Sequence, residues 1–184
     1  MNIVIFRHGQ TDWNVEGRLQ GSTNIPLNNL GLSQAKELAL RLSHISFDLI
    51  VSSDLDRAME TAKSLLEYQF CKVEADKRLR EIGLGDAEGL TISEVKKKYN
   101  IDNFREFNFP GREDTSSIGT RVNQLIEELY NAGYEAVALS SHGGVVWNWL
   151  RLWTHEVQQV GNTDAFLLEW DGQKALYKER ISNK

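Results

Sequence analysis

The chain has too few cysteines for a fold held by disulfides. Cys71 is the single cysteine among 184 residues, so no internal disulfide can form. No apolar run is long enough to span a bilayer, and no apolar segment with the features of a signal peptide is present. We therefore expect a cytoplasmic protein without a membrane partner.

The chain also lacks an excess of basic residues. Its 21 Lys and Arg residues against 26 Asp and Glu residues give a net charge of −5, and the isoelectric point is about 5.4. Such a chain has no broad positive field to attract nucleic acid or an anionic membrane surface. We expect no nucleic-acid partner, and an anionic ligand would have to be held by a local pocket.

No linker, repeat or low-complexity segment divides the chain. A composition of 41% hydrophobic and 26% charged residues is typical of a globular protein, and the length allows a substantial core. We therefore expect a single domain over residues 1–184.

Short apolar runs alternate with segments of helical period. Strands are expected at residues 2–6, 48–51, 136–141, 165–170 and 175–178, the last two forming a hairpin around Asp171-Gly172. Helices are expected at about residues 28–43, 93–99, 116–131 and 144–153, with a further helix opened by a capping box at Ser53-Asp54-Leu55-Asp56. This order predicts an α/β fold, a doubly wound three-layer sandwich whose mostly parallel sheet has an antiparallel edge.

Two of the expected helices have apolar positions at the spacing of one helical face. We expect these positions to face the core: Leu32, Ala35, Leu38, Ala39 and Leu42 in the first helix, and Leu55, Ala58, Met59, Ala62, Leu65 and Leu66 in the second.

Two histidines directly follow apolar strands. Arg7-His8-Gly9 ends the first strand, and His142-Gly143 follows the strand at residues 136–141. Open α/β sheets bind their ligands at the carboxyl ends of the strands. The two imidazoles are therefore expected to face each other across one pocket.

Two arginines support an anionic ligand. Arg7 would be costly to bury beside His8 without a counterion. Arg57 falls in the first turn of its helix, where the helix dipole disfavours a cation. A bound anion would relieve both residues, and the amides of Gly143 and Gly144 at the start of another helix could also meet an oxyanion. The alternative is an Arg57 that pairs with Asp54 or Asp56 at the surface.

Three acidic residues are candidates for acid or base chemistry. Glu81 precedes a glycine-rich loop, residues 83–89, which contains Asp86 and Glu88. Spacing alone does not choose among the three.

Several motifs in this order resemble the histidine phosphatase superfamily, within it the phosphoglycerate-mutase-like branch. The resemblance runs from residue 2 to about residue 150, and its first octapeptide is a highly specific signature. The motifs include Arg7-His8-Gly9-Gln10-Thr11-Asp12-Trp13-Asn14, Arg18-Leu19-Gln20-Gly21, Ser52-Ser53-Asp54-Leu55-Asp56-Arg57-Ala58, Leu79-Arg80-Glu81 and Ser141-His142-Gly143.

The resemblance implies a phosphoglycerate-mutase-like fold and a covalent mechanism on a small phosphomonoester. His8 would accept the phosphoryl group as a phosphohistidine, and Glu81 would be the general acid and then the base. The phosphoryl oxygens would be bound by Arg7, Arg57 and His142, with Asn14, Gln20, Gly21 and the Gly143 backbone completing the pocket. This chemistry needs no metal or other cofactor, and the sequence contains no cluster with the spacing of a zinc or two-metal site.

Hydrolysis is the first expectation for the reaction. The cofactor-dependent mutases of the family resemble one another in a longer insertion, whereas here 60 residues separate Glu81 from His142. Residues 79–91 look like those of broad-specificity phosphatases and α-ribazole phosphatases, so α-ribazole phosphate and sugar phosphates are candidate substrates. The alternatives are a phosphoglycerate mutase and a silent phospho-ligand binding module; the second is disfavoured because every required position is occupied.

The sequence departs from the family pattern in two places. Ala87 stands where the branch commonly has an aromatic residue, and Arg112 lies in an altered loop, where it could reach a second negative group or remain in solvent. Trp147, Trp149 and Trp153 are expected in the core or at an interface, and an exposed member of this set would suit a homodimer contact.

Overall fold

A six-stranded mixed sheet forms the centre of the computed structural model, which describes residues 1–103 and 110–182. The strand order is β3-β2-β4-β1-β5-β6. The strands are β1 (Asn2–Arg7), β2 (Leu49–Ser52), β3 (Lys72–Ala75), β4 (Ala136–Ser141), β5 (Ala165–Trp170) and β6 (Ala175–Ile181).

Three of the strand pairs are parallel and two are antiparallel. β1 pairs with β4, β4 with β2 and β2 with β3 in parallel, while β5 runs antiparallel to β1 and pairs with β6 in a hairpin. The predicted α/β fold, with a mostly parallel sheet and an antiparallel edge, is confirmed.

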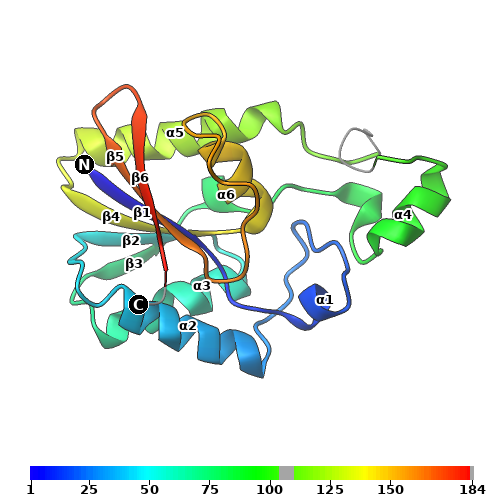
Figure 1. The fold of residues 1–184 in the computed structure, drawn as a ribbon, viewed down its shortest axis with the longest axis horizontal. Coiled ribbons are helices and arrows are strands. Elements are labelled where there is room, and N and C mark those ends of the chain that lie inside the picture. The colour runs from blue at the N-terminus through cyan, green and yellow to red at the C-terminus, as the bar shows by residue number, and fades with distance from the viewer. Residues whose placement is uncertain (104–109, 183–184) are drawn as a thin grey trace.

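Helices cover both faces of the sheet (Figure 1). One face carries α2 (Asn29–Arg41) and α3 (Asp56–Ser64), and the other carries α5 (Ser116–Asn131) and α6 (Gly143–Leu150). Away from the sheet lie the short α1 (Asp12–Val15) and α4 (Ile92–Tyr99). Single 3₁₀ turns complete the described elements: η1 (Leu65–Glu67), η2 (Lys77–Leu79) and η3 (Gly85–Ala87).

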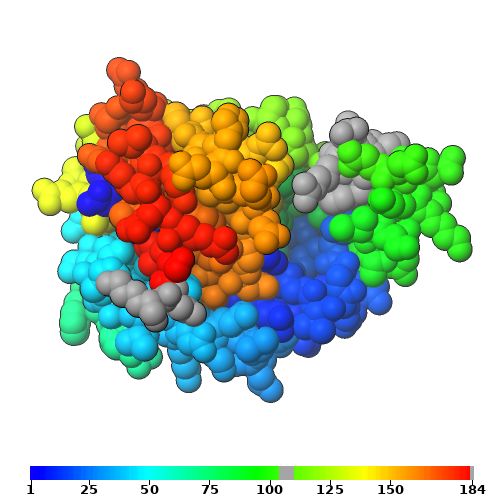
Figure 2. Space-filling view, viewed as in Figure 1, coloured from blue at the N-terminus to red at the C-terminus, as the bar shows by residue number. Residues whose placement is uncertain are grey.

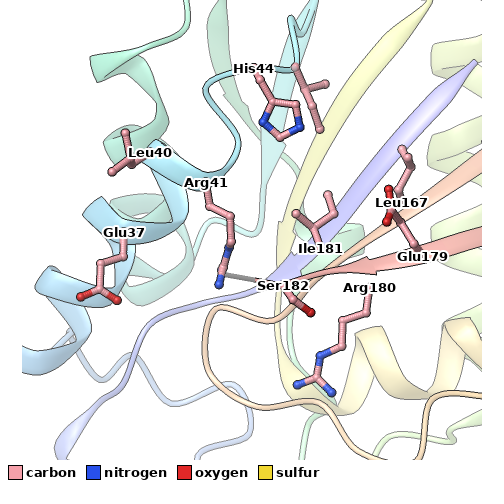
Figure 3. A pocket seen from close by; sticks show the side chains of 10 residues that line it. Glu37, Leu40, Arg41, His44, Leu167, Glu179, Arg180, Ile181 and Ser182 are labelled. Atoms are coloured by element: carbon pink, nitrogen blue, oxygen red, sulfur yellow. The ribbon is translucent and has the colours of Figure 1, made fainter. Parts of the chain in front are cut away.

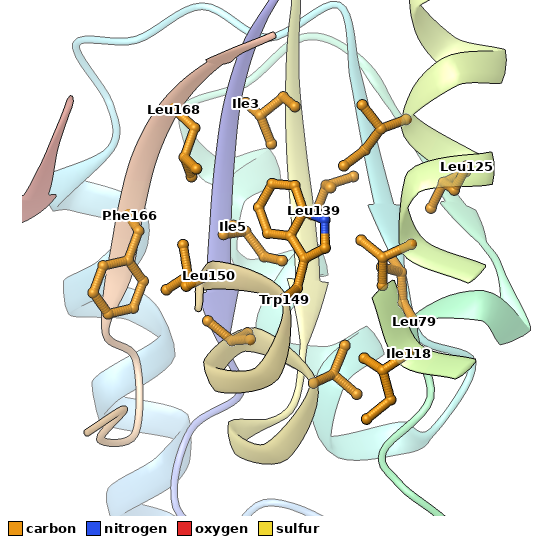
Figure 4. Packing of buried hydrophobic residues seen from close by; sticks show 14 of the residues in the cluster. Ile3, Ile5, Leu79, Ile118, Leu125, Leu139, Trp149, Leu150, Phe166 and Leu168 are labelled. Carbon is orange, nitrogen blue, oxygen red and sulfur yellow. The ribbon is translucent and has the colours of Figure 1, made fainter. Parts of the chain in front are cut away.

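Alternation along β1 divides the core into two layers. Ile3 and Ile5 pack with the residues of α5 and α6, whereas Val4 and Phe6 pack with those of α2 and α3. All four side chains are fully buried, as a central strand covered on both faces requires. Figure 4 shows the first layer, in which Trp149 of α6 lies over β1 and β4. Its indole nitrogen donates to Asn123 Oδ1 of α5 at 2.8 Å.

The expected capping box at Ser53 is wrong. α3 begins at Asp56 after an extended Leu55, and no side chain caps it. The Ser53 hydroxyl instead accepts from the Leu55 amide at 3.3 Å and bonds to His142 at 2.8 Å. A tertiary contact has taken the oxygen that the local pattern assigned to the helix.

Other element boundaries and faces differ from the sequence prediction. Leu32 and Leu66 are exposed rather than core residues, at 37% and 43%. α6 ends at Leu150, and β6 continues to Ile181. β3 was not predicted, because it is a short edge strand with exposed charged positions that lacks the alternation of a half-buried strand. In the described parts of the chain, no helix is both long and apolar enough to cross a membrane.

Gly31 gives the first testable prediction, because α2 touches the turn after β1 there. A Cβ at Gly31 would lie 2.0 Å from the Gln10 carbonyl oxygen. Alanine is favoured over glycine within a helix by about 1 kcal/mol. We nevertheless expect Gly31→Ala to lower the free energy of unfolding by about 1–3 kcal/mol, since the backbone must shift as in an overpacked core.

Urea unfolding measures this effect, with Ser33→Ala at an exposed position of the same helix as control. We expect the control to be near neutral. A Gly31→Ala protein as stable as the wild type would contradict the close contact.

Candidate active site

Parallel pairing of β1 and β4 brings the two histidines together. Arg7 lies opposite Ser141, and the His8 amide donates to the Ser141 carbonyl at 3.0 Å. The imidazole rings of His8 and His142 are 5.1 Å apart at their centroids, with 62° between their planes. The two histidines therefore lie together at one sheet edge, but they do not face each other across a pocket as predicted, because the rings contact each other directly and His142 does not line the cavity beside them.

A cavity of about 660 Å³ opens beside these rings. It lies where the segment after β1, the segment before β5 and the lobe carrying α4 come together (blue, orange and green in Figure 2). Eight of the nine predicted site residues line it, together with Arg112 and Gly144: Arg7, His8, Asn14, Gln20, Gly21, Arg57, Glu81 and Gly143. His142 lies behind this surface and is fully buried.

The His8 ring is held in one tautomer. Its Nδ1 is 2.6 Å from the Gly9 carbonyl oxygen, which can only accept, so Nδ1 carries the proton and Nε2 keeps its lone pair. Burial, assisted by the charges of Arg7 and Arg57, places the pKa of His8 well below 6.5. The ring is therefore neutral at neutral pH and presents an unprotonated Nε2.

Residues that the sequence analysis missed hold the His8 backbone. The side-chain Nδ2 of Asn162 donates to the His8 carbonyl at 3.0 Å and to Asn14 Oδ1 at 3.2 Å. On the other side, Thr61 Oγ1 accepts from the Gly9 amide at 3.1 Å. The Gly161-Asn162 pair signals a turn, but no local pattern indicates its contact with a residue so distant in the chain.

Arg57 is fully buried, so the alternative of a surface ion pair is wrong. Its Nη1 and Nη2 donate to the carbonyls of Thr23 and Gly21 at 2.7 and 2.8 Å. Asp54 instead forms an ion pair with Arg80, which donates to both carboxylate oxygens at 2.6 Å. Burial lowers the pKa of Arg57 to about 10, which leaves it charged at neutral pH.

Arg7 is the second cation of the cavity. Its Nη1 donates to the Val160 carbonyl at 3.0 Å, while its Nε is buried with no acceptor among the described residues. Burial lowers the pKa of Arg7, and the carboxylates of Glu81 and Asp164 partly oppose that shift. A buried guanidinium with an unused donor is a favourable place for an anion.

His142 faces Arg57 rather than open space. Arg57 Nε donates to His142 Nδ1 at 3.3 Å, so in the neutral ring Nε2 carries the proton and donates to Ser53 Oγ at 2.8 Å. Burial, with the charge of Arg57 next in size, places the pKa of His142 well below 6.5. Both ring nitrogens are used within the protein, so direct contact with a phosphoryl oxygen requires one of these bonds to be exchanged.

The structure separates the three candidate acids. Glu81 lines the cavity, and its carboxylate accepts from the Gly144 amide at 3.1 Å and from the Ile82 amide at 3.0 Å. Asp86 and Glu88 do not line it. The Gly144 amide, which was expected to meet an oxyanion, therefore donates to the Glu81 carboxylate instead. The Gly143 amide, as the first of α6, has no acceptor within the helix and remains at the cavity surface.

The smaller predicted binding residues also lie at the cavity. Asn14 Oδ1 accepts from the Thr11 amide at 3.1 Å as well as from Asn162, which leaves the Asn14 NH₂ group as its donor toward the cavity. Gln20 is buried, and its Oε1 has no partner in the described part of the chain.

The cavity also has apolar lining residues. Ala87, which stands where the branch commonly has an aromatic residue, is buried in the core. Trp147, the tryptophan that lines the cavity, donates its indole N–H to the Gln158 carbonyl at 3.2 Å and lies 4.7 Å from the Arg151 guanidinium. The apolar lining consists of Leu19, Ile82, Leu84, Ile92, Trp147 and Val160.

A larger, separate depression of about 1030 Å³ lies between α2 and β6 (Figure 3). Its two arginines have structural partners: Arg41 donates to the Thr163 carbonyl at 2.5 Å, and Arg180 pairs with Asp164 at 2.6 Å. None of the predicted site residues lines it. Across residues 1–103 and 110–182, no group of three or more His, Cys, Asp and Glu side chains is placed to hold a metal ion.

Comparison with known proteins identifies the family of the chain. The family model of the histidine phosphatase superfamily (branch 1) matches residues 3–179. A broad-specificity phosphatase from Saccharomyces cerevisiae is 31% identical over 197 residues, covering 100% of this chain and 86% of the relative. A probable phosphoglycerate mutase from Proteus mirabilis is 31% identical over 150 residues, covering 78% and 70% of the two chains.

Solved structures lead to the same family. A mycobacterial glucosyl-3-phosphoglycerate phosphatase complexed with VO3 superposes with a TM-score of 0.85 and 30% identity, covering 96% of each chain. The chain therefore belongs to the histidine phosphatase superfamily, and its fold is phosphoglycerate-mutase-like.

The buried histidines predict a distinctive titration. Because burial lowers both pKa values, the imidazole NMR signals of His8 and His142 should show neutral rings at pH 6.5 and lose that form only well below it. The unfolded chain takes up these protons at about pH 6.5, so the free energy of unfolding should fall as the pH drops below that value.

The signals are assigned with His8→Gln and His142→Gln, and the urea-unfolded protein serves as the reference. A titration midpoint at or above 6.5 for either ring in the folded protein would contradict the effect of burial.

Proposed function

We propose that this protein hydrolyses small phosphomonoesters through a phosphohistidine on His8. The observation that carries the proposal is the neutral His8 ring, whose Nδ1 is bound to the Gly9 carbonyl and which lines one cavity together with Arg7 and Arg57. An unprotonated nitrogen is the form that can attack phosphorus.

In the first step, His8 Nε2 attacks the phosphorus, and the bond to the ester oxygen breaks. Glu81, in its protonated form, gives its proton to the leaving oxygen, so the products are an alcohol and a phosphohistidine. Arg7 and Arg57 stabilise the charge on the phosphoryl oxygens, since phosphoryl transfer depends chiefly on alignment and electrostatics. The orphaned Arg7 Nε and the Gly143 amide supply further donors.

In the second step, the Glu81 carboxylate takes a proton from water as the water oxygen attacks phosphorus. The bond between phosphorus and Nε2 breaks, and the lone pair returns to His8. Inorganic phosphate leaves, and Glu81 is again protonated for the next cycle. The amides of Ile82 and Gly144 keep the carboxylate in place for both steps.

The outer cavity supports a leaving group with a substantial apolar surface. Leu19, Ile92 and Trp147 are among its lining residues, and the volume of about 660 Å³ exceeds what a phosphoryl group alone requires. The relatives include a glucosyl-3-phosphoglycerate phosphatase and a broad-specificity phosphatase, which supports sugar phosphates and related metabolites as the substrate class. Phosphate release from a panel that includes α-ribazole phosphate and 3-phosphoglycerate tests this class.

The same panel separates hydrolysis from phosphoryl movement within the substrate. Release of stoichiometric phosphate from 3-phosphoglycerate supports hydrolysis, whereas conversion to 2-phosphoglycerate without release would support a mutase. Absence of both, with retained phosphate binding, would support a silent binding module.

Labelling tests His8 directly. Brief incubation with a labelled phosphomonoester should leave acid-labile, base-stable label on the protein, because a phosphoryl group on nitrogen has that stability pattern. We expect His8→Ala to lose both the label and turnover, and we expect the wild type to keep its activity after exhaustive chelation. Persistent labelling of His8→Ala would exclude His8 as the nucleophile.

Leaving-group dependence tests Glu81. Glu81→Gln should slow alkyl phosphates by about 10²–10⁴-fold, the usual cost of losing a general acid, and should slow the burst phase with nitrophenyl phosphate much less. Asp86→Asn, which removes a carboxylate outside the cavity, is the control and should resemble the wild type. Equal impairment of both substrates in the burst phase would assign Glu81 to binding.

A further inference from the structure

Glu88 is a carboxylate outside the cavity with an unusually complete set of donors. Its Oε1 accepts from the Ser22 amide at 3.0 Å, the Ser22 hydroxyl at 3.1 Å and the Leu84 amide at 3.0 Å. Its Oε2 accepts from the Thr23 hydroxyl at 2.5 Å. These bonds join two loops that are far apart in the sequence.

The first of these loops, residues 21–23, accepts hydrogen bonds from Arg57. The carbonyls of Gly21 and Thr23, on either side of Ser22, accept from the two terminal nitrogens of the Arg57 guanidinium. The remaining nitrogen, Nε, donates to His142. The orientation of Arg57 is thus set by residues 21–23 together with one histidine.

Gly21 shows how closely this loop approaches Glu88. Its φ of +51° lies in the left-handed region that favours glycine, and a Cβ there would come within 2.2 Å of Glu88 Oε1. The carboxylate therefore lies directly against the backbone that holds the guanidinium.

The second loop contains Leu84 and directly follows Glu81, the proposed general acid. Leu84, whose amide binds Glu88, follows Glu81 by three residues and lines the cavity. One side chain consequently links the segment that positions Arg57 to the segment that supplies Glu81. The hydrogen bonds from Thr23, Leu84 and Ser22 also hold the pKa of Glu88 below its ordinary value despite partial burial, so the carboxylate is ionised at neutral pH.

We propose that Glu88 is a positioning residue that clamps residues 21–23 and thereby holds the Arg57 guanidinium in the orientation that binds the phosphoryl group. The proposal rests on the proposed function for its catalytic consequence. The clamp also predicts an effect on the binding of inorganic phosphate, which does not depend on turnover.

Two variants of Glu88 distinguish the clamp from the charge. Glu88→Gln keeps one oxygen for Ser22 and Leu84, and its NH₂ group can donate to the Thr23 hydroxyl, so most of the clamp survives. Glu88→Ala removes all of it. We expect Glu88→Ala to weaken inorganic phosphate binding about tenfold, as for a misplaced charged hydrogen bond, and to lower kcat/KM about 10²-fold.

Calorimetry with inorganic phosphate and steady-state kinetics measure these effects, with Asp86→Asn as the matched control. Asp86 is exposed in η3, the 3₁₀ turn that directly precedes Glu88. Its substitution removes an equal charge without touching residues 21–23. Glu88→Gln and the control should bind phosphate within about twofold of the wild type. If Glu88→Gln binds phosphate as weakly as Glu88→Ala does, the proposed clamp is wrong.

A double-mutant cycle with Arg57→Lys tests whether Glu88 acts through Arg57. Lysine lacks the fork that reaches both carbonyls, so Glu88→Ala should change phosphate affinity less than twofold in that background. Additive losses would overturn the proposal. If the wild type binds phosphate but hydrolyses no ester, the proposed function fails, while the binding cycle still tests Glu88.

Discussion

The parallel pairing of β1 with β4 is the contact on which the site depends. These neighbouring strands end at the same level, with Arg7 opposite Ser141, so the next residues along each strand are His8 and His142. Both strands are buried on both faces, and a shift of register by one residue would turn every apolar side chain to the opposite layer. The packing of the two layers thus determines the relative positions of the two imidazoles. The same pairing provides the Ser141 carbonyl that accepts from the His8 amide.

Burial determines the charge states of the residues at this site. The chain is acidic overall, yet its central cavity contains Arg7 and Arg57 with Glu81 as the lining carboxylate. Burial, assisted by the charges of Arg7 and Arg57, keeps both histidines neutral, whereas the guanidinium groups remain charged even with lowered pKa values. The result is a pair of neutral imidazoles beside two cations. Under the proposed function, a phosphoryl dianion would supply the counter-charge, and its binding should also stabilise the fold.

The parts of the site that follow from short-range sequence patterns were predictable. His8, His142 and Arg57 occupy ends of buried strands or the first turn of a helix, and alternation along β1 predicts its two-sided burial. Contacts between distant segments were not predictable in the same way. Ser53 matched a local capping pattern but bonds to His142, and Asn162 supports His8 from a loop with no distinctive motif. Spacing also left Glu81 and Glu88 equivalent. The backbone separates them by directing one to the cavity and the other to Ser22 and Leu84.

The central place of β1 has a consequence for synthesis on the ribosome. β1 is made well before its partners β4 and β5, whose residues opposite Asn2 are Ala136 and Glu169. Until those segments emerge, an apolar strand of high β propensity has both edges unpaired, a state that favours aggregation. Asn162 and Val160, which hold His8 and Arg7, emerge later still than β4. The sheet core and the complete candidate site therefore form only after β4 and residues 160–162 have been made.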